Sequence, residues 1–418
     1  MNLMTNNIVV TGMGVITPIG IGLDSFSEAL RKETANFSTI SFEKNAALYK
    51  YPIAKIVDFD FRKQIEKINL DSDLINKAKK LRHISKSNAF GIYCALEAWN
   101  DSGLTRGFDL TRIAIVSCGS NTQQSTLQDI QEKYADKLQF LNPNYGLNFF
   151  DTDLIGILSE LLGVKGEGHS ISAASASGNM GIIQGSRLIA SNEYDVVIVV
   201  APLMDISLYE YQGFTALGAM SRIEKNSKIS NIYRPFDDRH NGFVYGQSAG
   251  CLILESKESV LNRGGEFYGS IEGYGINLDA NRNPNPSKEG EQKAMQSALK
   301  NAGICSKQID YVNTHGSGSI VGDLTEVEAL LSIGLENVKA NSTKSLIGHS
   351  LSASGLVESI ASLIQIQEGF LHPTHNLEKA ISDDIDWIKN TPRKMNINYA
   401  MNNSFGFGGI NTSIIIKK

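Results

Sequence analysis

Cysteine and long apolar runs are both scarce in this sequence. Its 418 residues include four cysteines, scattered without CxxC or metal-ligand spacing: Cys94, Cys118, Cys251 and Cys305. This pattern predicts buried or free thiols in a reducing compartment and not a disulfide framework. No apolar run approaches the roughly 20 residues of a membrane-spanning helix. Residues 1–7 are short and polar and do not resemble a secretory signal. We therefore expect a cytoplasmic protein without a membrane span.

Positive charge is not in excess either. The formal net charge is −5, so no overall basic field attracts nucleic acid or an anionic membrane. Basic residues gather locally in a stretch predicted as one helix, residues 74–102, whose first part carries Lys79, Arg82 and His83. Two interpretations stay open for this stretch, a solvated helix face or a docking patch for an acidic partner.

Short apolar runs alternate with helical stretches along the chain, as in a layered α/β protein. We expect strands at residues 8–12, 113–117, 196–201, 251–255, 267–273, 311–314, 338–342 and 412–416. A polar link between the fourth and fifth of these strands indicates two α/β halves, which we place at residues 1–258 and 259–418. No sequence repeat is visible, so any duplication is expected in the structure alone.

Four segments combine small residues, histidines and glycines in a pattern typical of an active site. Residues 170–178 (SISAASASG) predict a strand, a tight turn and a helix, whose N-terminus stabilises negative charge on the turn. Residues 313–319 (NTHGSGS) and 342–349 (STKSLIGH) each place a histidine in a glycine-containing loop after a strand. Residues 403–411 (NSFGFGGIN) form a glycine-rich segment. Glycines let the backbone approach a ligand, and strand ends are where α/β proteins place their chemistry.

In this order and at these separations, the four segments resemble those of the β-ketoacyl-acyl-carrier-protein synthases, the ketosynthases of the thiolase superfamily. Residues 10–20 (VTGMGVITPIG) and residues 234–237 (RPFD), which lead to residues 242–244 (GFV), are similar to that family as well. The resemblance spans essentially the whole chain. It implies a thiolase-like α/β fold, in which two fused βαβαβαββ halves form a layered α-β-α-β-α structure, usually as a homodimer.

The resemblance also implies roles for individual residues. The position of the family's nucleophilic cysteine falls on Ser175, and His315, His349 and Lys344 match the family's active-site histidines and lysine. Phe407 matches the phenylalanine at the pocket mouth, and its backbone N–H would join that of Ser175 in an oxyanion hole. The other expected pocket residues are Phe405, Phe214 and Phe243. The residues expected to dock an acidic carrier protein are Lys79, Arg82 and His83.

Several positions depart from the family's pattern. Gln247 and Ser248 replace an acidic residue and a glycine, and the sequence assigns no effect to them. Ala173 and Ile410 replace threonines. Together with Asn179, these last two changes indicate a diverged protein and not an ordinary synthase with one altered codon.

A serine at the nucleophile position separates the two halves of a condensation. A thiol, with its pKa near 8.5, is lowered into the physiological range by a helix N-terminus, whereas a serine hydroxyl needs a general base. We therefore expect Ser175 to be a poor acyl acceptor. The ring N–H groups of His315 and His349 would still stabilise an enolate, with Lys344 orienting His315.

The function implied is that of the serine-bearing malonyl-acyl-carrier-protein decarboxylases of polyketide β-branching, which the chain resembles. These enzymes turn malonyl-carrier protein into acetyl-carrier protein and carbon dioxide, and they supply a hydroxymethylglutaryl-CoA-synthase-like partner. The expected substrate is carried on the phosphopantetheine of an acyl carrier protein, and neither a metal nor a further cofactor is expected.

Two other functions stay open. One is a non-catalytic partner of a ketosynthase, like the chain-length factors, which usually lose the histidines that this chain keeps. The other is an acyltransferase or condensing enzyme in which Ser175 is a true nucleophile and a histidine is its base.

Overall fold

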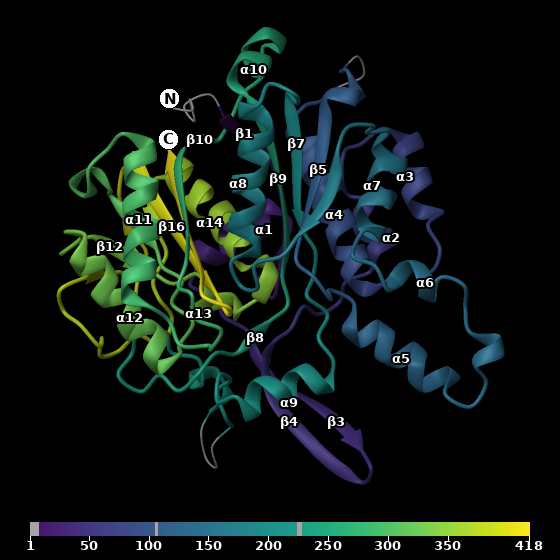
Figure 1. Cartoon of the computed structure of the whole chain (residues 1–418), viewed down its shortest axis with the longest axis horizontal. Coiled ribbons are helices and arrows are strands. Elements are labelled where there is room, and N and C mark those ends of the chain that lie inside the picture. The colour runs from purple at the N-terminus through teal and green to yellow at the C-terminus, as the bar shows by residue number, and fades with distance from the viewer. Residues whose placement is uncertain (1–7, 105–107, 224–227) are drawn as a thin grey trace.

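The structure, a computed structural model, describes residues 8–104, 108–223 and 228–418. One sheet of twelve strands runs through this part of the chain (Figure 1). Across the sheet the strands are β14 (Asp386–Trp387), β12 (Lys339–Asn341), β11 (Tyr311–Asn313), β16 (Tyr399–Gly406), β17 (Ile410–Lys417), β10 (Gly269–Leu278), β1 (Ile8–Thr17), β9 (Ala249–Ser256), β7 (Val196–Ala201), β5 (Ile113–Cys118) and β6 (Gly168–Ile171), with β2 (Gly20–Ile21) beside β1.

The sheet repeats one five-strand arrangement twice. In the first half the neighbours are β1-β9-β7-β5-β6, and in the second they are β10-β17-β16-β11-β12. In both halves, neighbours among the first three strands are antiparallel and neighbours among the last three are parallel. The halves join where Val9 of β1 lies opposite Ser270 of β10. The predicted thiolase-like fold is confirmed, while the boundary between residues 258 and 259 stays a prediction.

The two halves of the sheet form the two β layers of an α-β-α-β-α arrangement, and helices form the other three layers (Figure 1). Helix α4 (Lys86–Asp101) packs on the outer face of the first half, and α11 (Lys288–Ala302) and α12 (Ile320–Ser332) cover the second half. Between the halves lie α8 (Ser177–Ala190) and α14 (Ser354–Glu368), which pack against each other. Helix α14 is buried on every side over most of its length, because its small and apolar residues are spread around the whole helix.

The remaining elements surround this core. The other helices are α1 (Leu23–Arg31), α2 (Phe61–Ile65), α3 (Ser72–Lys79), α5 (Gln124–Tyr134), α6 (Tyr145–Asn148), α7 (Asp153–Leu162), α9 (Leu208–Ala216), α10 (Lys257–Arg263) and α13 (Lys344–Ile347). The other strands are β3 (Phe37–Lys44), β4 (Ala47–Ala54), β8 (Tyr245–Gly246), β13 (Phe370–Leu371) and β15 (Arg393–Lys394). Strands β3 and β4 form a hairpin that extends from the body beside α9 (Figure 1).

The first turns of α8 and α14 meet at closest approach. A Cβ on Gly178 would lie 2.3 Å from the backbone nitrogen of Leu356, and one on Gly355 would lie 2.9 Å from the backbone nitrogen of Asn179. The Asn179 amide donates to the carbonyl of Asn402 on β16 (3.1 Å) and accepts from the Asn402 side chain (3.0 Å). This packing fixes the starts of both helices, from which the site described below is built.

The prediction of a single helix over residues 74–102 is wrong. The chain forms α3, leaves helical geometry and begins again as α4. His83 has φ 59°, in the left-handed region, and Ser85 caps α4 by accepting the N–H of Asn88 at 3.1 Å. A helix cannot continue through a left-handed residue, and the serine satisfies one of the free N–H groups of the new start.

Two expectations from composition can be compared with the structure. Cys94, Cys118 and Cys251 are buried and Cys305 is exposed, and all four are free thiols, as predicted. Among the described residues no helix has both the length and the apolar character needed to cross a membrane. Residues 1–7, on which the prediction about a secretory signal rested, lie outside the described residues.

The contact between the central helices predicts a strong effect of one methyl group. We expect Gly178→Ala to lower the free energy of unfolding by about 1–3 kcal/mol, because backbone atoms must move to admit the new Cβ. Gly156→Ala in α7 is the matched control: its Cβ would meet nothing within 4 Å. That change should be neutral or stabilise by up to about 1 kcal/mol. Denaturant unfolding measures both, and equal effects would contradict the packing argument.

Candidate active site

Ser175 lies on the turn between β6 and α8, as the sequence predicted. Ala174 before it has φ 48°, in the left-handed region. The turn is closed by Ser177, whose hydroxyl accepts the N–H of Ala173 (2.8 Å) and donates to the carbonyl of Ala174 (2.7 Å). The Ser404 hydroxyl donates to the Ser175 carbonyl at 2.9 Å. Both neighbouring serines therefore hold the backbone and leave the Ser175 hydroxyl for the site.

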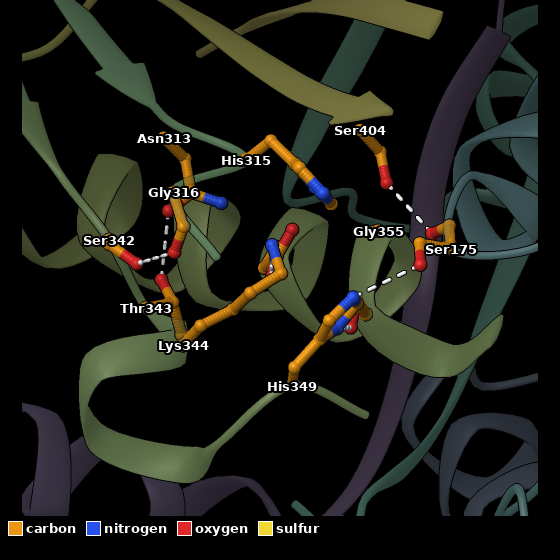
Figure 2. A network of polar contacts seen from close by, with 12 residues as sticks. Ser175, Asn313, His315, Gly316, Ser342, Thr343, Lys344, His349, Gly355 and Ser404 are labelled. Carbon is orange, nitrogen blue, oxygen red and sulfur yellow. Dashed lines mark hydrogen bonds and ion pairs between the residues drawn. The ribbon is translucent and has the colours of Figure 1, made fainter. Parts of the chain in front are cut away.

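His349 makes the direct contact with Ser175, with 3.0 Å between its Nε2 atom and the serine Oγ (Figure 2). On the other side of the ring, Nδ1 accepts the backbone N–H of Leu351 at 3.3 Å and lies 2.9 Å from the Ser354 hydroxyl. A backbone N–H can only donate, so Nδ1 is the acceptor and a neutral ring carries its hydrogen on Nε2. His349 therefore donates to the Ser175 hydroxyl and does not accept its proton.

His315 follows β11 and is held by a buried carboxylate. Glu326 accepts the backbone N–H groups of His315 and Gly316, both at 2.8 Å, and burial raises its pKa to about 7. The His315 ring packs edge-on against His349, with 5.5 Å between ring centroids, and contacts Phe405. Its Nδ1 atom is buried and has no hydrogen-bond partner among the described residues.

Both histidines are neutral. Burial lowers the pKa of each ring well below its ordinary value of 6.5, and the positive charge of Lys344 lowers the pKa of both further. His349 adds to this effect at His315. A neutral imidazole has one N–H to offer, so each ring can act as a single uncharged donor.

Lys344 stands behind the histidines and forms a buried ion pair. Its Nζ atom lies 2.5 Å from Oε1 of Glu358 on α14, and both side chains are fully buried. Burial raises the pKa of Glu358, and the lysine partly offsets that rise. Figure 2 shows His315 and His349 pointing toward the turn that carries Ser175, with the Lys344 side chain extending into the interior behind them. Sequence reasoning missed Glu358, although no other charged residue occurs in residues 354–367.

A cavity of about 400 Å³ opens onto these groups. Ser175, His315 and His349 line it, and so do all four predicted aromatic residues: Phe214, Phe243, Phe405 and Phe407. Phe407 is partly exposed, as expected at a mouth. Lys344 is not part of the lining. The size falls in the range of sites for small ligands.

The predicted docking residues lie elsewhere. Lys79, Arg82 and His83 are not among the residues that line the cavity. Lys79 ends α3 and pairs with Glu66, while Arg82 and His83 are exposed in the following loop. The structure leaves the choice between a solvated face and a docking patch open.

Most of the departures from the family's pattern have structural partners, but the buried Ser248 hydroxyl has no hydrogen-bond partner among the described residues. The Gln247 side chain accepts the N–H of Ile56 at 3.1 Å and so holds the chain after β4. Ser248 beside it is fully buried. Ile410 begins β17 and pairs with Gly406. Asn179 forms the buried link to β16 described above. None of these contacts touches Ser175, His315 or His349.

Comparison with known proteins identifies the class to which this fold and site belong. The profile of the beta-ketoacyl synthase N-terminal domain matches residues 5–259, and that of the C-terminal domain matches residues 268–378. The chain therefore belongs to the β-ketoacyl synthase family.

The individual relatives include both a decarboxylase and a condensing synthase. The chain is 37% identical to the polyketide biosynthesis malonyl-ACP decarboxylase PksF of Bacillus subtilis, over 98% of this chain and 96% of that one. It is 31% identical to 3-oxoacyl-[acyl-carrier-protein] synthase 2 of Staphylococcus aureus, over 98% of each chain. A solved structure, the ishigamide ketosynthase/chain length factor, matches with TM-score 0.85 and 26% identity over 99% of both chains.

The buried ion pair predicts an asymmetric response to mutation. Lys344→Met leaves the Glu358 carboxylate buried without its partner, which typically costs about 3–5 kcal/mol of stability. Replacing both residues, in Lys344→Met with Glu358→Leu, should cost clearly less than Lys344→Met alone, since no unpaired charge stays in the core. Denaturant unfolding of the single and double variants measures this difference. A double variant at least as unstable as the single one would contradict the expectation.

Proposed function

We propose that this protein decarboxylates malonyl-carrier protein to acetyl-carrier protein and carbon dioxide. The observation that supports this most is the state of His349: with Nδ1 accepting from Leu351, its Nε2 is a donor. His349 is the ring in contact with Ser175, and in this state it cannot take the serine's proton. His349 therefore offers a donor for an oxyanion and is not the base that a serine nucleophile requires.

The reaction follows from donors without a nucleophile. When the carboxylate leaves as carbon dioxide, the electrons of the broken carbon–carbon bond move into an enolate whose charge collects on the thioester oxygen. Nε2–H of His349 and a ring N–H of His315 are the donors we assign to this oxygen. A proton from water then completes the acetyl group. Uncharged donors in a buried site can stabilise such charge strongly, because water does not screen them.

Ser175 is a resting partner of His349 in this scheme. The thioester oxygen would take the place of the serine hydroxyl as acceptor of the Nε2 hydrogen. No covalent acyl-enzyme forms, and the substrate stays on the phosphopantetheine of its carrier throughout. We propose no metal and no further cofactor for these steps.

The retained histidines and lysine favour an enzyme over a non-catalytic partner subunit. A partner without activity has no need to keep His315, Lys344 and His349 around a cavity, with Glu358 buried to balance the lysine. The discriminating observation is whether the chain co-purifies as a heterodimer with a ketosynthase and is inert alone, as a chain-length factor would be.

We propose an acyl carrier protein as the main partner, in a cytoplasmic polyketide pathway that also uses a hydroxymethylglutaryl-CoA-synthase-like enzyme. The Bacillus relative is a malonyl-ACP decarboxylase, which supports an acyl carrier protein as the partner.

We also propose that the chain forms a homodimer through the edge of the sheet at β6. Strand β6 ends the sheet, so nothing among the described residues pairs with its outer edge. Several exposed apolar side chains occur in the segment that leads to it: Leu138, Phe140, Leu147, Phe149 and Phe150. The backbone carbonyl of Asp151, next to Phe150, lies within hydrogen-bond distance of the Ser170 hydroxyl on β6 (3.4 Å). An unpaired strand edge beside exposed apolar side chains is a surface that a second copy could cover.

The proposed reaction predicts that mutation of one cavity residue leaves kcat nearly unchanged and that mutation of another lowers it strongly. Incubated with malonyl-loaded carrier protein and followed by intact mass, the protein should produce acetyl-carrier protein above the no-enzyme control. Ser175→Ala should retain kcat within about threefold, because the serine only occupies a donor that the substrate then uses. His315→Ala should lose about 10²–10³-fold, the usual contribution of one such donor.

The same mass measurement tests the alternative mechanism. An acyl adduct on Ser175, together with loss of activity in Ser175→Ala, would support a serine nucleophile and contradict the proposal. If the unaltered protein produced no acetyl-carrier protein, the proposal that it is a decarboxylase would be wrong.

The basic residues after α3 allow a separate prediction about the partner. If they dock an acidic carrier protein, Lys79→Glu with Arg82→Glu should raise KM for malonyl-carrier protein severalfold and leave kcat nearly unchanged. The effect should shrink at high ionic strength, where surface charges are screened. Lys307→Glu with Lys300→Glu, two changes on the second half, controls for net charge. An unchanged KM would mean that the stretch is a solvated face.

A further inference from the structure

One wall of the cavity is made of hydroxyl groups. Ser120 follows β5 and Ser172 follows β6, and both line the cavity beside Ser175. Their Oγ atoms are 2.9 Å apart, so one hydroxyl donates to the other. Strands β5 and β6 are parallel neighbours, so their carboxyl ends meet at one edge of the sheet, which is also where the turn of Ser175 begins. The hydroxyl pair therefore lines the same cavity as Ser175.

This wall is held in place from behind. Asp151 accepts the backbone N–H groups of Asn121 (2.8 Å) and Thr122 (3.0 Å) and the Thr122 hydroxyl (2.9 Å). Asn121 has φ 56°, a left-handed conformation that ties the loop to one shape. With three hydrogen bonds to one carboxylate, the loop that carries Ser120 cannot easily retreat to admit a larger group.

The polar character continues along the same edge. Met204, which follows β7 and lines the cavity, has its sulfur 3.8 Å from the hydroxyl of Ser352, another lining residue. The apolar surface there is thus broken by a further hydroxyl. An alkyl chain laid along this edge would strip water from the hydroxyls and return no hydrogen bond, which is unfavourable. A malonyl or acetyl group has too few carbons to meet that penalty.

We propose that Ser120 and Ser172 are specificity-determining residues, which restrict the acyl part of a thioester bound at Ser175 to two- or three-carbon units and reject alkyl chains. This inference rests on the cavity being the thioester site, as in the proposed function. It does not depend on decarboxylation, because it concerns which acyl groups bind and not what happens to them.

Binding of unreactive analogues tests the proposal without any turnover. The probes are pantetheine derivatives in which an amide replaces the thioester, carrying acetyl, hexanoyl or decanoyl groups, and titration calorimetry gives each Kd. An apolar channel would tighten binding about fourfold for each methylene it buries. For the unaltered protein we expect hexanoyl and decanoyl to bind no more tightly than acetyl, because the desolvated hydroxyls cancel the gain from the buried methylenes.

The hydroxyls are then removed. In Ser120→Ala with Ser172→Ala we expect hexanoyl to bind at least about tenfold more tightly than in the unaltered protein, the gain from roughly two buried methylenes, while acetyl is unchanged. Ser191→Ala with Ser332→Ala is the control, since neither serine lines the cavity and both bond only to nearby backbone: Ser332 donates to Ala329, while Ser191 donates to Leu188 and accepts the N–H of Glu193. The control should bind all three probes like the unaltered protein.

Each outcome decides. Tighter binding of hexanoyl than of acetyl by the unaltered protein would overturn the proposal. So would equal hexanoyl affinity in the unaltered and Ser120→Ala/Ser172→Ala proteins, including no binding by either. Production of acetyl-carrier protein, measured on the same preparations, reports the proposed function separately. Its absence together with the expected selectivity would leave the specificity assignment standing and remove the decarboxylase.

Discussion

The site depends on how closely the two central helices approach each other at their first turns. Gly178 and Gly355 leave no room for a Cβ, so each helix start lies against the backbone of the other. The turn before α8 carries Ser175, and the loop before α14 carries His349, so this contact brings their side chains to 3.0 Å. Asn402 bonds to Asn179 in the same place and aligns β16 with the turn. The positions of the Ser175 and His349 side chains thus depend on backbone packing between the two halves of a duplicated fold.

A buried ion pair determines the electrostatics of the site. Lys344 and Glu358 neutralise each other inside the core, out of reach of the cavity. Together with burial, the lysine keeps His315 and His349 uncharged. Uncharged rings bind a neutral thioester without strong electrostatic preference, and their donors gain strength only as charge develops on its oxygen. An arrangement of this kind favours the transition state over the bound substrate, which is what a catalyst requires.

Much of this could be predicted from sequence, and the exceptions share one cause. The strand at 196–201 has the predicted bounds because it is a continuous apolar run, buried on both faces. The resemblance to the family, carried by the glycine-containing motifs, led us to expect Ser175, His315, His349 and the four aromatic residues at one site, and all of them line one cavity. The interruption at His83, the pairing of Glu358 and the protonated nitrogen of His349 could not be predicted. Each depends on the path of the backbone and not on residue type alone: a left-handed angle at His83, the packing of α14 that brings Glu358 to Lys344, and the loop that turns the Leu351 N–H toward the His349 ring.

Two independent features of the cavity bear on the same function. A thiolate at position 175 would accept the His349 hydrogen as an anion and could still attack a thioester. The serine accepts it as a neutral group, and nothing in contact with it takes its proton. The hydroxyl pair of Ser120 and Ser172 belongs to other strands and would oppose an alkyl chain whatever stood at 175. A condensing enzyme needs both a nucleophile and room for the chain it extends. In the reaction we propose, no chain is extended, so no room for one is needed, and water supplies the proton that the enolate takes.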